Sequence, residues 1–346
     1  MPSVFQRSII SIMKIYLKNI IKNLLTLGIV VFAIYFVFKD HYQEILDCLI
    51  NLSPLNLLLI LSLGILLLCV DSLAYYYSLN HNDVDINFSD GFKLATINAF
   101  FNVLTSYVAT MPLQILFLKN KHYPISKAVK NIIEICLFHK LATLSLALLF
   151  GLSHFKYLKV HYEAQLNIIL LGFIISSIIA LALTLIIYAN SMRSQLIKIL
   201  NRLRFKSFQH KKAQIIELLD NLNAEANSLK NLFSLYLLEL LKIFITINIT
   251  YFCISCLGFK EITYGECLTL NSLILIAVSS LPSMAGFGPT ELSFMLFYNP
   301  VLDKNLTLIC LILYRVASYF WPFIISAVAF IFYRNELLGG NNDWNS

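Results

Sequence analysis

The sequence predicts an all-α polytopic membrane protein. Of its 346 residues, 58% are hydrophobic and 13% are charged, whereas roughly a quarter of the residues in a soluble domain are charged. The mean hydropathy is +0.75, and a helix needs about 20 apolar residues to cross a bilayer. Apolar runs such as 166–188 lack the alternating polarity that is typical of a transmembrane β-strand. These observations exclude an ordinary soluble protein and a membrane β-barrel.

Eight apolar segments follow one another along the chain. They lie near residues 23–38, 54–79, 94–118, 131–152, 166–189, 232–257, 266–297 and 305–333. The third and the seventh are interrupted by proline and small polar residues, and the seventh also by glycine. Interrupted backbone at membrane depth is stable only where it is buried in protein or lines a water-filled cavity.

The charges of the loops predict the topology. The net charge is +7, and Lys and Arg gather at 1–22, 119–130 and 190–230. If all eight segments crossed the membrane, 119–130 would lie outside, against the tendency of basic loops to stay cytoplasmic. The conflict disappears if both interrupted segments return to the side they left. We therefore expect six full spans, two re-entrant hairpins and cytoplasmic termini.

The two halves of the chain then share one order of elements in opposite orientations. Each half reads as two spans, a re-entrant hairpin and a final span, so the eight segments form two inverted repeats in one integral membrane domain, 1–346. Interrupted segments at corresponding positions of such repeats are typical of a binding site near the bilayer midplane.

Residues 190–230 are a sizeable polar stretch whose apolar positions recur at helical spacing. We expect a cytoplasmic, basic, amphipathic loop. The basic residues within 193–212 suit contact with an anionic leaflet. A solvated connector is the alternative.

The seven cysteines lie mostly inside or beside apolar segments, where a thiol behaves as a small apolar side chain. An odd number without a loop framework argues against structural disulfides. Cys253 and Cys256 form a C-x-x-C motif without a second pair, which disfavours metal binding or redox chemistry.

Ionisable groups inside apolar helices are costly and usually mark function. The sequence has seven such groups: Asp71, Glu134, Lys140, Glu239, Lys242, Glu291 and Arg315. Glu239 and Lys242 share one helix face, which favours mutual neutralisation without a further role. Asp71 and Lys140 are equally compatible with a position near the membrane interface, to which a Lys side chain can extend.

The most specific segment is 279–294. Gly286 and Gly288 permit a tight turn with close backbone approach, and Pro289 suits the first position of a helix that continues to Tyr298. The amide groups at this helix start predict a weak anion site.

Glu291 falls in the first turn of that helix, where the helix dipole favours a carboxylate. Arg315 on the last span is its expected partner, because a guanidinium fork binds either a carboxylate or a lipid phosphate. The alternative is a buried pair that only locks the hairpin to the last helix.

These motifs resemble a known family. Leu281-Pro282, Gly286-x-Gly288-Pro-Thr-Glu291, Tyr314-Arg315 and Trp321-Pro322 resemble the transmembrane flippase region of bacterial lysylphosphatidylglycerol synthases. The resemblance covers nearly the whole chain and is strongest at 279–322. In the first half, the stretch Asn102–Gln114 corresponds to the family's other hairpin motif, of which only Asn102 is clearly kept. Glu134 falls where the family often has a Glu.

The resemblance implies transport of a phosphate-bearing lipid or lipid-linked amphiphile across the bacterial inner membrane, without a cofactor, a metal or catalytic residues. The residues implied in headgroup binding are Pro282, Gly286, Gly288, Pro289, Thr290, Glu291, Arg315, Asn102, Gln114 and Glu134. Because the chain ends at Ser346, we expect no soluble aminoacyl-transferase domain and no synthesis of aminoacyl lipid.

Two other functions stay open. A membrane-embedded transferase would use Glu134, Asp71 or Glu291 as the base on a polyprenyl-linked substrate, although the sequence has no acidic metal cluster. A non-transporting subunit would present lipid to a synthase or a glycosyltransferase. A homodimer is compatible with each of these functions, and the sequence identifies neither the headgroup nor the driving force.

Overall fold

Helices are the regular elements throughout the part of the chain that the structure describes. The computed structural model describes residues 50, 52–80, 86–105, 109–189, 193–195, 197–198, 229–260, 262–279 and 288–338. The expected segment 23–38, most of the loop 190–230, and the site residues Pro282 and Gly286 lie outside these ranges. The longer helices are α3 (Pro54–Leu79), α4 (Phe88–Thr105), α5 (Thr110–Asn120), α6 (Ile125–Ser153), α8 (Leu166–Tyr188), α11 (Leu229–Cys256), α12 (Tyr264–Ser279), α13 (Pro289–Tyr298), α14 (Lys304–Arg315) and α15 (Trp321–Leu338). Short elements are α7 (Phe155–His161), η1 (Glu163–Gln165) and η3 (Val316–Phe320).

Five of the described helical stretches are long and apolar enough to cross a membrane. They are Pro54–Leu79, Ile125–Ser153, Glu163–Tyr188, Asn231–Cys256 and Lys304–Tyr333. They coincide with five of the apolar segments that we expected to be full spans. The prediction of an all-helical membrane protein is confirmed.

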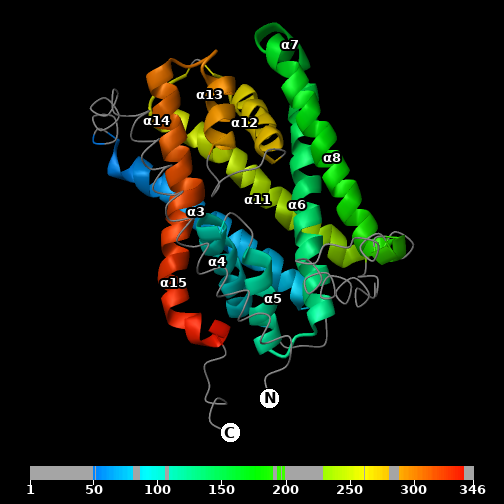
Figure 1. Cartoon of the computed structure of the whole chain (residues 1–346). Coiled ribbons are helices and arrows are strands. Elements are labelled where there is room, and N and C mark those ends of the chain that lie inside the picture. The colour runs from blue at the N-terminus through cyan, green and yellow to red at the C-terminus, as the bar shows by residue number, and fades with distance from the viewer. Residues whose placement is uncertain are drawn as a thin grey trace, which may run out of the picture.

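The two interrupted segments each form a pair of shorter helices. The segment 94–118 contributes to α4 and α5, and the segment 266–297 to α12 and α13. Within each pair the two helices pack against each other. The pair α4–α5 lies at the end of the molecule that holds the C-terminal end of α15, whereas α12, α13 and α7 lie at the opposite end (Figure 1).

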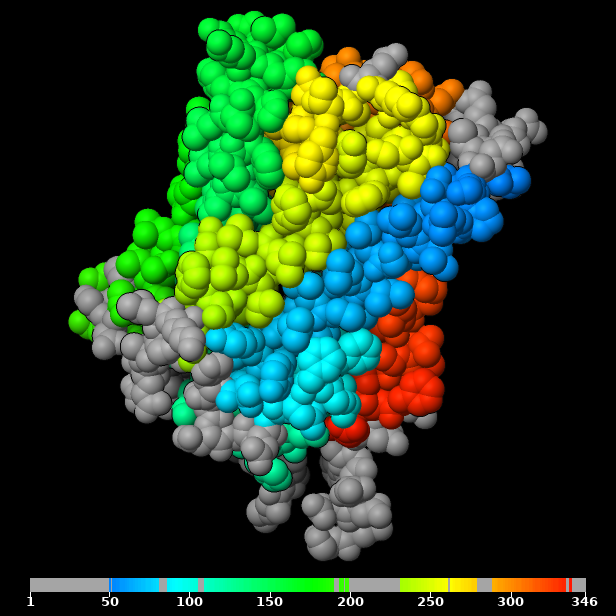
Figure 2. Space-filling view, turned by 180° about the vertical axis from the view of Figure 1, so that it is seen from behind, coloured from blue at the N-terminus to red at the C-terminus, as the bar shows by residue number. Residues whose placement is uncertain are grey.

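Helices α3 and α11 pack along each other in the centre, and Figure 2 shows them as neighbouring diagonal bands, blue and yellow-green. Around them, helices of the first half of the chain pack against helices of the second half. Helix α4 packs against α15, the last helix of the second half, and α12 packs against α6 of the first half.

The last span is interrupted by η3, a π-helical turn in which the amide of Trp321 donates to the carbonyl of Val316, five residues earlier. Pro322 explains the turn, because a proline ring in an α-helix clashes with the carbonyl four residues before it, here that of Ser318. The wider turn also approaches α3 closely. A Cβ atom at Gly64 would lie 2.3 Å from the carbonyl oxygen of Ala317.

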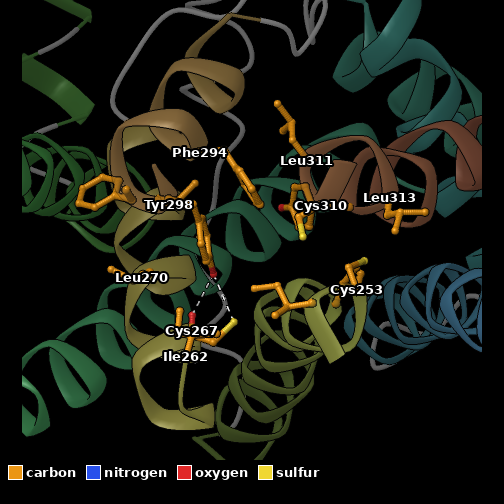
Figure 3. Packing of buried hydrophobic residues seen from close by; sticks show 14 of the residues in the cluster. Cys253, Ile262, Cys267, Leu270, Phe294, Tyr298, Cys310, Leu311 and Leu313 are labelled. Carbon is orange, nitrogen blue, oxygen red and sulfur yellow. Dashed lines mark hydrogen bonds between the residues drawn. The ribbon is translucent and has the colours of Figure 1, made fainter. Parts of the chain in front are cut away.

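Aromatic rings and thiols fill the core between α11, α12, α13 and α14 (Figure 3). The rings of Phe294 and Tyr298 stack with centroids 4.5 Å apart, and the Tyr298 hydroxyl lies 3.3 Å from Cys267 Sγ. Cys253 and Cys310 are fully buried in the same cluster. These thiols pack as small apolar side chains, as their sequence context predicts.

Candidate functional site

The structure brings Glu291 and Arg315 together at the junction of α13 with the last span. Arg315 Nε donates to Glu291 Oε1 at 2.8 Å, and Arg315 Nη2 lies 2.6 Å from the same oxygen. The predicted pairing is therefore present. It joins the second residue after the start of α13 to the last residue of α14.

Glu291 also caps its own helix. Gly288 has a φ of 95°, which favours glycine, and its amide donates to Glu291 Oε2 at 2.7 Å. Pro289, at the first helical position, has no amide hydrogen to offer. The carboxylate of Glu291 thus occupies the anion position that the sequence predicts at this helix start.

The two partners differ in their access to the surroundings. The side chain of Arg315 is 8% exposed and that of Glu291 is 25% exposed. The guanidinium carbon lies 5.1 Å from the ring centroid of Tyr319, which adds a cation–π contact. The 12-residue helix α14 places Arg315 about 16 Å along the span from its first residue. An arginine inside a span is costly unless it pairs with an acidic side chain or with backbone carbonyls.

A second polar group of residues lies at the first helix pair. Thr110 Oγ1, at the start of α5, donates to Asn102 Oδ1 at 2.6 Å. Asn102 Nδ2 donates to Asn98 Oδ1 at 2.9 Å, and Asn98 Nδ2 donates to Asp71 Oδ2 at 3.2 Å. Neutral side chains therefore connect the tip of the α4–α5 pair to a buried carboxylate on α3.

That carboxylate belongs to a charged cluster shared by three helices. Lys242 on α11 forms a short ion pair with Asp71 and lies 3.7 Å from Glu239 Oε2. His139 Nδ1 on α6 lies 2.9 Å from the same Glu239 oxygen. Asp71 is 6% exposed and Glu239 is fully buried, so both carboxylates lie inside the protein. The neutralisation predicted between Glu239 and Lys242 is only part of the arrangement.

Two expected headgroup residues make contacts between helices. Gln114 is buried, and its Nε2 donates to the Tyr75 hydroxyl at 2.7 Å and to the Leu94 carbonyl at 3.3 Å. Glu134 is fully buried and accepts from the Tyr188 hydroxyl at 3.0 Å. These contacts join α5 to α3 and α4, and α6 to α8.

The sequence analysis did not assign His139 and Asn98 to a site, because neither belongs to the motifs of the resemblance or to the ionisable groups that are charged at neutral pH. A hydrogen-bonding residue on α6 could have been found from the excess of carboxylates over cations in the facing helices. Nothing in the sequence spacing pairs residues 139 and 239.

A family model described as the lysylphosphatidylglycerol synthase TM region matches residues 23–326, which is most of the chain. No curated protein matches the sequence.

Proposed function

The chain belongs to the lysylphosphatidylglycerol synthase transmembrane-region family and is a multi-pass membrane protein, and from this premise we propose that it translocates a phosphate-bearing lipid between the leaflets of the bacterial inner membrane. The observation that carries the proposal is the ion pair between Arg315 and Glu291 inside the span. A guanidinium held by an exchangeable carboxylate at a helix start has the chemistry needed to receive a lipid phosphate.

Exchange of anions is the proposed step. Glu291 accepts hydrogen bonds from Arg315 through Oε1 and from the Gly288 amide through Oε2. A phosphate has enough acceptor oxygens for both donors, so it replaces the carboxylate without leaving Arg315 unpaired. The return of Glu291 then releases the phosphate. The greater exposure of Glu291 makes it the partner that moves aside.

The packing supports two inverted repeats with re-entrant hairpins. In each half, the first helix of the pair, α4 or α12, packs against the last helix of the other half, and the central contact joins α3 with α11. Asn120 Nδ2, at the end of α5, donates to the Leu337 carbonyl at 2.9 Å, so the α5–α6 turn lies beside the end of the last span. We propose six full spans, two hairpins and cytoplasmic termini.

Accessibility labelling tests this topology. Single cysteines introduced as Asn120→Cys and Ser207→Cys should react with a membrane-impermeant maleimide from the same face, the cytoplasmic one. The background protein must lack its native cysteines and retain its thermal stability. Labelling from opposite faces contradicts the re-entrant arrangement.

The function is tested in liposomes that contain fluorescently labelled phosphatidylglycerol, with dithionite quenching of the outer leaflet as the readout. We expect wild-type protein to move the lipid without a covalent change that mass spectrometry would detect. Glu291→Gln should fold and bind lipid but translocate at least about tenfold more slowly, because the amide no longer competes as an anion for Arg315. Arg315→Lys should also be impaired, because an ammonium group lacks the planar fork.

Glu266→Gln is the matched control. Glu266 also caps the start of a helix of the second hairpin, α12, and accepts from the Thr263 amide at 2.9 Å. The Glu266→Gln protein should translocate lipid at the wild-type rate. Normal translocation by well-folded Glu291→Gln contradicts the exchange mechanism. If both single charge removals lose the folded protein and a charge-swapped double variant recovers it, the pair is a structural lock. Covalent conversion of the lipid would favour the transferase instead.

A further inference from the structure

One face of the last span carries a row of exposed apolar side chains. We define the α15 stripe as Phe320, Ile324, Val328 and Ile331. Their spacing places them on one side of the helix, and each residue is between 37% and 62% exposed. At a rise of about 1.5 Å per residue, the stripe is about 16 Å long. It follows the half of the span that ends beside the first hairpin.

The α15 stripe begins beside the Glu291–Arg315 pair. The guanidinium carbon of Arg315 lies 5.1 Å from the ring centroid of Tyr319. The Tyr319 ring in turn meets the Phe320 ring edge-on, with centroids 5.6 Å apart, and Tyr319 is partly exposed. An apolar surface therefore leads from the cation to the stripe. A phospholipid has the same order of groups, a phosphate followed by an acyl chain.

A different side of α15 is packed against α4. The ring of Phe100 stacks on the rings of Phe323 and Phe330, with centroids 5.4 Å and 5.3 Å away. The Thr96 hydroxyl oxygen lies 2.6 Å from that of Tyr333. These contacts fix the rotation of α15 about its axis, so the α15 stripe stays at the surface of the protein.

The length of the α15 stripe suits one acyl chain. The hydrocarbon core of a bilayer is about 30 Å thick, so the chains of one leaflet extend over about 15 Å. The stripe has this length. On the other side of the ion pair, α13 exposes Leu292 and Leu296, which lie about 6 Å apart along the helix. Of these two helices, α15 is therefore the one that offers a surface as long as a chain.

We propose that the α15 stripe binds an acyl chain of a phospholipid whose phosphate is paired with Arg315. This inference rests on the proposed function, and it names the ligand as a phospholipid with acyl chains of ordinary membrane length. No covalent bond changes in this contact.

The proposed contact defines the orientation of the bound lipid. Its phosphate lies near the middle of the last span, and its chain extends toward the first hairpin. A free phospholipid in the leaflet beside the α15 stripe has the reverse orientation, because its chain ends at the middle of the bilayer. The bound lipid is therefore oriented like the lipids of the opposite leaflet, on the side of α7 (Figure 1).

Photolabelling of the full chain in lipid nanodiscs tests this orientation. The probes are phosphatidylglycerol with a diazirine near the ester end of one acyl chain, and the same lipid with the diazirine at the chain end. Fragmentation mass spectrometry identifies the labelled residues. We expect the first probe to label Phe320 and the second to label Ile331. Free lipid of the adjacent leaflet gives the reverse order.

Competition separates bound lipid from free lipid. Unlabelled phosphatidylglycerol should lower the labelling of Phe320 by the first probe more than an equal amount of diacylglycerol, which lacks the phosphate. Arg315→Lys should lower this labelling at least about threefold, because an ammonium group lacks the planar fork. The matched controls are Ile174 and Ile178, exposed apolar residues on α8. Both competitors should dilute their labelling equally, and Arg315→Lys should leave it unchanged.

The reverse order of labelling, equal competition by the two lipids, or the absence of label on α15 overturns the proposed chain contact. The competition uses the wild-type protein, so it decides the proposal even if Arg315→Lys does not fold. Transport of fluorescent phosphatidylglycerol in liposomes is measured separately. If the expected labelling is found without any lipid movement, the proposed function is overturned and the chain contact stands.

Discussion

The two hairpins are held by different chemistry. The first, α4–α5, is held at its tip by hydrogen bonds among neutral side chains, from Thr110 through Asn102 to Asn98. The second, α12–α13, packs aromatic rings such as Phe294 against Tyr314 of the last span and is joined to it by the ion pair between Glu291 and Arg315. A guanidinium binds carboxylate and phosphate alike through charge-assisted hydrogen bonds, which are stronger than those between neutral groups. The comparison indicates that the second hairpin is the one suited to exchange a ligand.

The first hairpin is also fastened at its base. Lys93 Nζ lies 2.7 Å from Glu336 Oε2 on α15, and Lys121 Nζ lies 3.2 Å from Asp90 Oδ1. Asp90 and Asn87 cap each other at the start of α4. The first hairpin thus has polar contacts at its tip and at its base, whereas the ion pair of the second hairpin lies at the start of α13.

Removal of Lys242 should give the largest effect. Lys242→Met removes the cation that Asp71 and Glu239 share and leaves them only the contacts with Asn98 and His139, which costs about 3 to 5 kcal/mol. Arg315→Met should cost less, because Glu291 keeps the Gly288 amide and is partly exposed. Thermal and denaturant unfolding in detergent measures both values. Equal losses of unfolding free energy in Lys242→Met and Arg315→Met would contradict the view that the first hairpin is held more rigidly than the second.

Gly64→Ala should have the next largest effect. The added Cβ would lie 2.3 Å from the Ala317 carbonyl oxygen, and overpacking of this kind costs about 1 to 3 kcal/mol. The same variant displaces the turn that follows Arg315, so it should also slow transport. Gly151→Ala is the control, since its nearest neighbour would be 3.9 Å away, and it should be neutral or stabilising.

Thr110→Val tests the neutral bonds of the first hairpin. It removes the hydroxyl that donates to Asn102 with little change in shape, and it should cost about 1 kcal/mol. Transport should remain above half of the wild-type rate. A loss of transport as large as that of Glu291→Gln would show that both hairpins take part equally in ligand exchange.

The smallest effect on stability is expected at the base of the first hairpin. Glu336 is 47% exposed, and exposed ion pairs contribute about 0 to 1 kcal/mol. Glu336→Gln should therefore lower the melting temperature slightly at low salt and not at all at high salt. A large, salt-independent loss would mean that the base, rather than the tip, fixes the first hairpin.

The sequence predicts much of the second hairpin because its signals are local. Proline, glycine and a first-turn carboxylate define the start of α13 at Pro289, and the partner Arg315 is a rare cation in an apolar run. The first hairpin gives weaker signals. Its amides and hydroxyls belong to common residue types. Their bonds lead to Asp71 on α3, whose own partner, Lys242 on α11, lies 171 positions away in the sequence.

Some predicted residues could not be assigned from the sequence for a physical reason. Gln114 and Glu134 were expected to bind a headgroup on the basis of a motif alone, yet their side chains contact Tyr75 and Tyr188. Whether a buried polar group faces a ligand or a neighbouring helix depends on the rotation of its helix. Neither hydropathy nor residue type determines that rotation.

The π-helical turn Val316–Phe320 has a consequence for how the last span changes during evolution. The bond from the Trp321 amide to the Val316 carbonyl accommodates one more residue than an α-helical turn does. Insertion of a single residue can therefore be absorbed locally, without rotating α15 by the 100° per residue that a regular helix would impose. We expect relatives without a proline at position 322 to have one residue fewer here. In an alignment, that single gap would mark the boundary between α14, which ends at Arg315, and α15, which ends beside the first hairpin. At this boundary the rotation of one helix about its axis can change without the same change in the other.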